Sequence, residues 1–163
     1  KLISKMKNRN GSDIGLRGFT IIELLIAITI LVIIAGVAIV SINPIDQLSK
    51  ARNTQRELHL QALMSAIRQN ISESPTGAFI CAAGSISTST KRMAIGADNY
   101  DIAGCLVPNY IPTLPFDPAT SSAHYASNTD YDTGYTIVQA TSTGAITLSA
   151  PAAELKKTIS ITR

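Results

Sequence analysis

Three residues near the start of this 163-residue chain have types and spacing that suit chemistry: Gly18, Phe19 and Glu23. A glycine before an aromatic residue is a small-residue site that a peptidase can cut, and the cut would give Phe19 a new amine. Glu23 is then the one acid at the threshold of a long apolar run. At the surface of a membrane, such a carboxylate favours the positive end of a helix macrodipole. Buried among apolar helices, it would instead need a cationic partner.

The apolar run predicts the element that positions these residues. Residues 24–42 are nineteen positions without a charged side chain, and as a helix they would span about 28 Å, close to the thickness of a bilayer core. Residues 1–18 hold five basic residues and one acid, and they lack the apolar region that precedes an ordinary secretory cleavage site. This asymmetry predicts that the basic side stays cytoplasmic and that the rest is exported.

The charge of the chain gives little reason to expect nucleic acid as a partner. The formal net charge is +3, but nine basic and ten acidic residues remain once residues 1–18 are set aside. The net positive charge therefore comes from the leader. A phosphate-binding surface would need many more cations than residues 75–163 offer. The basic residues of this range are Lys91, Arg92, Lys156, Lys157 and Arg163.

Gly18, Phe19 and Glu23, followed without a gap by the apolar run, resemble the N-terminal signature of type IV pilins and of the pseudopilins of type II secretion. The resemblance implies a precursor that a prepilin peptidase cleaves between Gly18 and Phe19 and methylates on the Phe19 amine. It also implies a homo-oligomeric filament, assembled through the N-terminal helix on an inner-membrane platform, in which Glu23 pairs with the amine of a neighbouring subunit. The helix would lie in membrane lipid before assembly and in a periplasmic or cell-surface filament afterwards.

A second helical segment is expected to follow the membrane segment. Residues 44–74 repeat apolar residues at helical spacing, which predicts an amphipathic stalk helix. Pro44 is expected to kink the helix rather than to end it, because the periodicity resumes at once. Arg52, Arg56 and Glu57 are interpreted as a charged strip that faces solvent or another subunit.

The remaining residues, 75–163, predict an exported head with a small antiparallel sheet. Residues 135–140, 145–149 and 158–162 are strand-like, and the proline-rich residues 106–118 predict an irregular strap across the head. The expected architecture is therefore α+β and pilin-like, with a long N-terminal helix packed on the sheet. Its segments are 1–18 (prepilin leader), 19–43 (transmembrane and assembly helix), 44–74 (stalk helix) and 75–163 (head with a C-terminal sheet).

Two cysteines, Cys81 and Cys105, lie in the head and allow a single pairing. Because an exported domain meets an oxidising environment, a disulfide is predicted, and two free buried thiols are the alternative. Closing a loop of this length would stabilise the head by roughly 3–4 kcal/mol in the chain-entropy model.

Three aspartates of the head are candidate ligands for a metal. Asp117, Asp130 and Asp132, with backbone carbonyls of residues 128–134, offer the hard oxygen ligands that calcium prefers, and pseudopilins often hold calcium before their last strands. The spacing matches no known calcium loop, and aspartate-rich turns are common without metal. Calcium is therefore a possible cofactor and an ordinary turn is the alternative.

The sequence carries no catalytic motif of a nucleotide-binding, metalloprotease or serine-hydrolase type, so we expect a structural protein and no enzyme. A structural filament subunit is the first hypothesis. The alternative is a membrane-anchored exported binding domain that never polymerises, or a minor tip pilin that contacts DNA or a surface.

Overall fold

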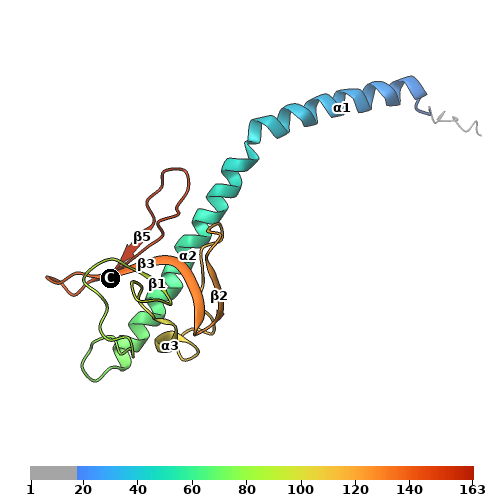
Figure 1. Cartoon of the computed structure of the whole chain (residues 1–163). Coiled ribbons are helices and arrows are strands. Elements are labelled where there is room, and N and C mark those ends of the chain that lie inside the picture. Colours follow the sequence, from blue (N-terminus) through green and yellow to red (C-terminus); the bar gives the residue numbers. More distant parts are fainter. Residues whose placement is uncertain (1–17) are drawn as a thin grey trace, which may run out of the picture. The chain divides into compact units, whose positions relative to one another are not determined.

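The computed structural model describes residues 18–163 (Figure 1). Internal contacts divide the chain into two units, one up to Asn43 and one from Pro44 to Arg163. The predicted leader, 1–18, lies outside the described residues except for Gly18.

The first unit contains one helix, α1 (Ile21–Ile42). It ends at Asn43, whose φ of 45° and ψ of 76° are left-handed, and the second helix begins at Pro44. Proline disfavours helical geometry at the preceding residue, asparagine tolerates the left-handed region, and proline is well suited to the first position of a helix. The expected kink is therefore a break of one residue between two separate helices.

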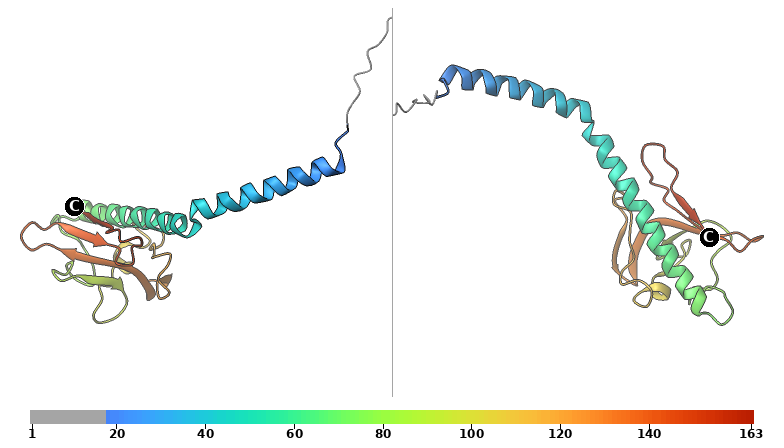
Figure 2. Two further views of the ribbon diagram at one scale, coloured as in Figure 1. Left: turned by 90° about the horizontal axis from the view of Figure 1, so that it is seen from above. Right: turned by 180° about the vertical axis from the view of Figure 1, so that it is seen from behind.

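The second unit is built on α2 (Pro44–Glu73) and an antiparallel sheet that lies along one side of it (Figure 2). The strand order is β1-β3-β4-β5, and β2 pairs with the first residues of β3. A short helix, α3, lies between β1 and β2 in the chain. The bounds are β1 (Lys91–Ala94), α3 (Ala103–Leu106), β2 (His124–Ser127), β3 (Asp130–Gln139), β4 (Ile146–Ser149) and β5 (Ser160–Thr162).

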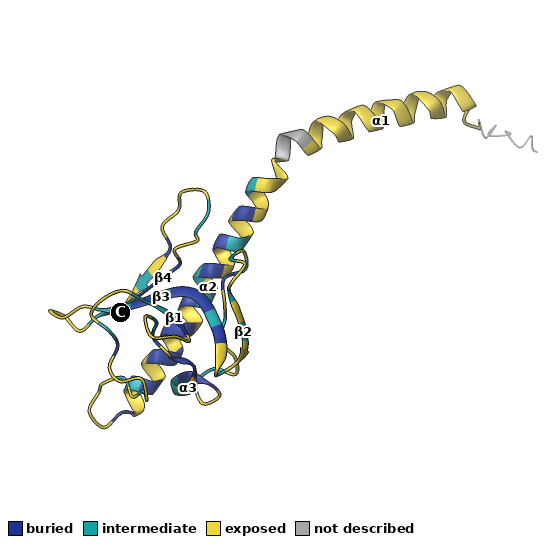
Figure 3. Ribbon diagram, viewed as in Figure 1, coloured by how far each residue is buried: buried dark blue, intermediate teal, exposed yellow. Residues whose placement is uncertain are grey.

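The core lies between the second half of α2 and the sheet (Figure 3). Five apolar side chains of this part of α2 are at most 3% exposed, and they pack with buried side chains of β3 and β4, among them Tyr135, Ile137 and Leu148. The α2 residues concerned are Leu60, Leu63, Met64, Ala66 and Ile67. The predicted α+β, pilin-like fold class, with a helix packed on a small antiparallel sheet, is confirmed.

The disulfide between Cys81 and Cys105 is present, with 5.0 Å between the two Cα atoms. It joins the segment after α2 to α3. Asn70 holds the same region from α2, because its side-chain amide donates to the carbonyls of Ile80 and Cys105 at 3.0 and 3.3 Å. The predicted pairing is confirmed.

Residues 128–134, whose carbonyls were expected to bind calcium from a loop, are a strand from Asp130 onward, where β3 begins, so that expectation is wrong there. Tyr131 and Thr133 are buried on alternate positions, as in a strand with one face on the core. The Tyr131 hydroxyl also accepts the backbone N–H groups of Ile102 and Ala103, at 2.8 and 3.2 Å. The aspartates suggested a turn, but the residues between them form a strand.

Arg56 is not part of an exposed strip, because its side chain is 0% exposed. Its guanidinium donates to both carboxylate oxygens of Asp117, from Nε at 2.7 Å and from Nη2 at 3.1 Å. Nη1 donates to Glu154 Oε2 at 2.9 Å and to Asn53 Oδ1 at 2.8 Å. This arrangement corrects the interpretation of Arg56, because three segments of the chain meet at one buried cation.

A second layer of contacts surrounds this cluster, which we call the Arg56 clasp (Arg56, Asp117, Glu154, Asn53 and Arg52). Asn53 binds the backbone of Glu154 in both directions: its amide donates to the carbonyl at 2.9 Å and its oxygen accepts the N–H at 3.0 Å. Arg52 donates to Glu154 from Nε at 2.7 Å, and its side chain is 24% exposed. The first half of α2 is therefore attached to the head by polar contacts.

The clasp keeps both carboxylates charged. Burial raises the pKa of Asp117, but the hydrogen bonds from Arg56 and from the backbone of Ala119 and Thr120 outweigh it, so the pKa lies below its ordinary value. Hydrogen bonds from Arg52 and then Arg56 lower the pKa of Glu154 to about 2. Both groups are therefore anionic at neutral pH.

We expect Arg56→Met to destabilise the head by about 3–5 kcal/mol, because it leaves the buried Asp117 carboxylate without its cation. Arg52→Met is the matched control, since its ion pair is partly exposed and is expected to contribute much less. Urea unfolding of the detergent-solubilised chain, followed by near-UV circular dichroism, measures this, because all five tyrosines lie in the head. Equal losses in the two variants would contradict the role assigned to Arg56.

Stability of the head is expected to fall in acid. A carboxyl group with a lowered pKa in the folded state contributes stability above its unfolded pKa, about 4, and that contribution is lost as pH falls toward the folded value. For Glu154 this window runs from about 4 down to about 2. Unfolding at a series of pH values should show this slope in the native chain and a shallower slope in Arg56→Met/Asp117→Leu. An unchanged slope in that variant would assign the acid sensitivity to other groups.

Candidate processing and assembly site

Gly18 and Phe19 precede α1 in non-helical, exposed backbone. The Phe19 side chain is 83% exposed. A Cβ atom built on Gly18 would meet nothing within 4 Å, so the packing of this chain does not require a glycine there. The bond between the two residues is thus open to another protein, and a need for a small residue at position 18 would come from that protein.

Thr20 starts the helix, a role that the sequence interpretation missed. Its backbone is extended, with φ −78° and ψ 151°, and its Oγ1 accepts the N–H of Glu23 at 3.2 Å. The Leu24 N–H donates to the Thr20 carbonyl at 3.1 Å. The signal was present, because a threonine three residues before a glutamate is the spacing of a capping box. This cap fixes the helix start directly after the Gly18–Phe19 bond.

Glu23 lies in the first turn of α1, where a negative charge suits the helix macrodipole. In the part of the chain that the structure describes, no cationic side chain pairs with its carboxylate. Within one chain, Glu23 thus has the position expected of a carboxylate at the membrane surface, beside the positive end of the helix macrodipole. Its carboxylate remains available to a cation from another chain.

The side chains of α1 are exposed from Ile21 to Ile39, the stretch that is long and apolar enough to cross a membrane by length and composition (Figure 3). The polar Thr29 turns back on the helix, with Oγ1 donating to the carbonyls of Leu25 at 2.7 Å and Ile26 at 2.9 Å. Its hydroxyl is therefore hydrogen-bonded without water. A polar group inside lipid or among apolar helices requires such an internal partner.

The three aspartates expected to hold calcium each have a different partner. Asp117 is in the Arg56 clasp, and Asp132 accepts from Arg92 Nε at 2.6 Å. Asp130 lies on the surface, 3.1 Å from His124 Nε2.

The expected grouping of Asp117, Asp130 and Asp132 is therefore not found. Each carboxylate is turned to its own cationic or histidine partner, and between residues 18 and 163 no three acidic, histidine or cysteine side chains gather as a metal-binding group. These residues do not fit a shared calcium ion, and calcium binding stays a prediction without support from them.

Comparison with known proteins bears on the N-terminal part of the chain. A family model described as the prokaryotic N-terminal methylation motif matches residues 17–39. The match contains Gly18, Phe19, Glu23 and most of α1, and it ends before the second unit. No curated protein and no solved structure matched the chain. The chain therefore carries the leader signature of type IV pilins and pseudopilins, and the predicted resemblance is confirmed for its N-terminal part.

Proposed function

We propose that this chain is a structural subunit of a type IV pilus or of a type II secretion-like pseudopilus. It is made as a precursor, cleaved between Gly18 and Phe19 by a prepilin peptidase, methylated on the Phe19 amine and polymerised through α1. The leader side faces the cytoplasm, the head is exported, and an inner-membrane platform receives the subunit from lipid.

The observation that carries the proposal is the methylation motif placed on this geometry. The bond to be cut lies outside the helix, in exposed backbone, and the Thr20 cap sets where the helix begins. Cleavage at this bond leaves Phe19, the Thr20 cap and the whole of α1 on the mature chain. An ordinary secretory signal loses its apolar segment on cleavage, whereas this chain keeps it.

Glu23 supports assembly through α1. In a bundle of such helices its carboxylate would be buried among apolar side chains, where an unpaired charge is costly. The amine created at Phe19 is cationic. Phe19 lies two residues before Ile21, the first helical residue, so its amine is at the same end of α1 as Glu23. A neighbouring subunit shifted along the bundle axis can thus offer its amine to this carboxylate.

Processing is tested by mass analysis of the N-terminus of the protein from its own cells. We expect a mature chain that starts at Phe19 and carries one methyl group on its amine. In Gly18→Leu the leader should stay attached, because the bulkier side chain is placed next to the scissile bond, while the head should still form. A native chain that retains its leader in membranes that contain the peptidase would contradict the proposal.

Assembly is tested with Glu23→Leu, which makes α1 more apolar. We expect normal membrane retention and processing, but a fall in sheared filament of about ten-fold or more, since a lost pairing of about 1.4 kcal/mol per subunit is a ten-fold change in association. Thr29→Leu is the control, because it also removes a polar group from the exposed helix but no charge. Normal filament yield with Glu23→Leu would contradict the pairing of Glu23 with a neighbouring amine, whereas absence of filament from the native chain would favour the anchored, non-polymerising alternative.

A further inference from the structure

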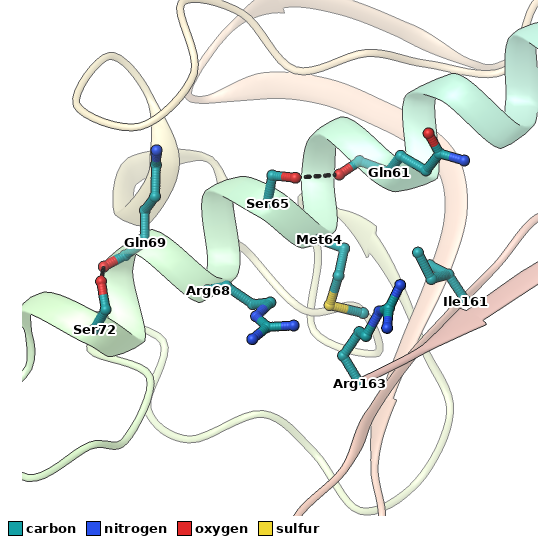
Figure 4. A pocket seen from close by; sticks show the side chains of 8 residues that line it. All are labelled: Gln61, Met64, Ser65, Arg68, Gln69, Ser72, Ile161 and Arg163. Carbon is teal, nitrogen blue, oxygen red and sulfur yellow. Dashed lines mark hydrogen bonds between the residues drawn. The ribbon is translucent and has the colours of Figure 1, made fainter.

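A groove of about 720 Å³ runs between the exposed face of α2 and the end of the sheet (Figure 4). Gln61, Met64 and Arg68 of α2 form one wall, and Ile161 of β5 with Arg163 forms the other. In Figure 4 the two guanidinium groups point into the space between these walls, on either side of Met64. The charged side chains that line the groove are thus both cationic.

The two groove arginines differ from the other arginines that the structure describes. Arg52, Arg56 and Arg92 each hold a carboxylate. Arg68 and Arg163 have no ion pair and no side-chain hydrogen bond within residues 18–163, and both line the same groove. A guanidinium has a planar fork of donors that fits a carboxylate. Two of them lining one groove form a surface suited to an acidic segment.

The head supplies one segment of that kind. Among its described carboxylates, only Asp98 and Asp101 lack a cationic or histidine partner. Both are exposed and both lie in the loop 96–101 that follows β1. The other four are Asp117, Asp130, Asp132 and Glu154.

This acidic loop, residues 96–101, is held in one conformation. The N–H of Tyr100 donates to the carbonyl of Arg92 at 2.8 Å, and its hydroxyl donates to the carbonyl of Gly84 at 2.7 Å. Asn99 closes the turn through its N–H to the Gly96 carbonyl at 3.1 Å. Asp98 is therefore presented on an ordered loop, which lowers the entropy lost on binding.

The acidic loop and the groove belong to opposite edges of one sheet. In the order β1-β3-β4-β5, the loop follows β1 and the groove borders β5. Three strand spacings, about 14 Å, separate these edges, so the two surfaces lie at opposite edges of the sheet within a chain. Two copies can join them head to tail, and such a heterologous contact repeats into an open filament when its rotation does not close a ring.

We propose that the Arg68–Arg163 groove binds the acidic loop of a second copy of this chain. The inference rests on the proposed filament function and names the contact between heads that accompanies packing of the helices. Each pair of charges is solvent-exposed, so one contact is weak and sensitive to salt. Repetition along a filament, where α1 already holds the subunits together, makes the weak contact effective.

The test measures sheared filament from cells that produce the full chain. Arg68→Glu/Arg163→Glu should lower the yield about five-fold or more, as should Asp98→Arg/Asp101→Arg. A chain with all four changes should recover filament, because the loop and the groove have then exchanged charge. Lys156→Glu is the control: it also reverses an exposed cation that no carboxylate among residues 18–163 holds, but it lies outside the groove. Near-UV circular dichroism of the tyrosines checks that each head is folded.

A second measurement does not depend on charge. Arg68→Cys subunits and Asp98→Cys subunits, assembled together and oxidised, should give a disulfide-linked dimer that neither variant gives alone.

The outcomes separate this inference from the proposed function. If the native chain makes no filament, the proposed function fails. If filaments form normally with Arg68→Glu/Arg163→Glu and no cross-link appears, the groove contact is wrong while the filament function stands. If the groove variant loses filament but the four-fold exchange does not restore it and no cross-link forms, another molecule occupies the groove and the second copy is overturned as its partner.

Discussion

The attachment of α2 to the head depends on one buried cation. Arg56 has no exposed surface, and its guanidinium is shared between Asp117, in the strap before β2, and Glu154, in the loop between β4 and β5. A charge in this position requires partners at defined angles, since the carboxylates must meet the plane of the guanidinium. Because hydrogen bonds are directional and hydrophobic contact is not, the clasp fixes the rotation and register of α2 more strictly than the apolar contacts of Leu63 and Ile67 do. The half of α2 that begins at Pro44 is thus attached to the head by polar contacts, and the half that ends at Glu73 by apolar contacts.

The same constraint explains details of the strap. The Asp117 N–H donates to the Thr133 carbonyl at 2.9 Å, so the strap lies directly on β3. A Cβ atom at Gly134 would lie 2.9 Å from the Asp117 Cβ, and Gly134 has a φ of 76°. A larger residue would both clash and be strained. The glycine therefore gives the strap the close approach that brings the aspartate to Arg56.

The sequence was informative where a local pattern decides the structure. The uncharged run of α1, the helical spacing of Leu60, Leu63 and Ile67, and the strands near Tyr135 and Leu148 follow from periodicity, and the fold class follows from their order. The two cysteines allowed one pairing, which formed. The methylation motif needs only adjacent residues, so it too was readable.

What was missed depends on partners far apart in the chain. Arg56 and Asp117 are 61 positions apart, and Arg56 and Glu154 are 98 apart, so nothing near Arg56 indicates burial. A basic residue on a polar stretch of helix is usually solvated, and that base rate gave the wrong interpretation. The short strand β1 begins with Lys91-Arg92 and shows no alternation, and the first part of β3 was hidden by its aspartates. Thr20 was a different failure, because its capping pattern was visible and was not used.

The exposure of α1 from Ile21 to Ile39 bears on the direction of any assembly reaction. In the proposed function this helix never has water as its solvent: it is surrounded either by acyl chains or by the side chains of other helices, and these are almost equally apolar. Transfer from a bilayer to a bundle therefore gains little from the hydrophobic effect, although that effect dominates the folding of the head. The sign of the free energy of transfer then depends on a few polar groups and on the packing of side chains. Small differences at the helix start and between heads are therefore enough to favour assembly or disassembly.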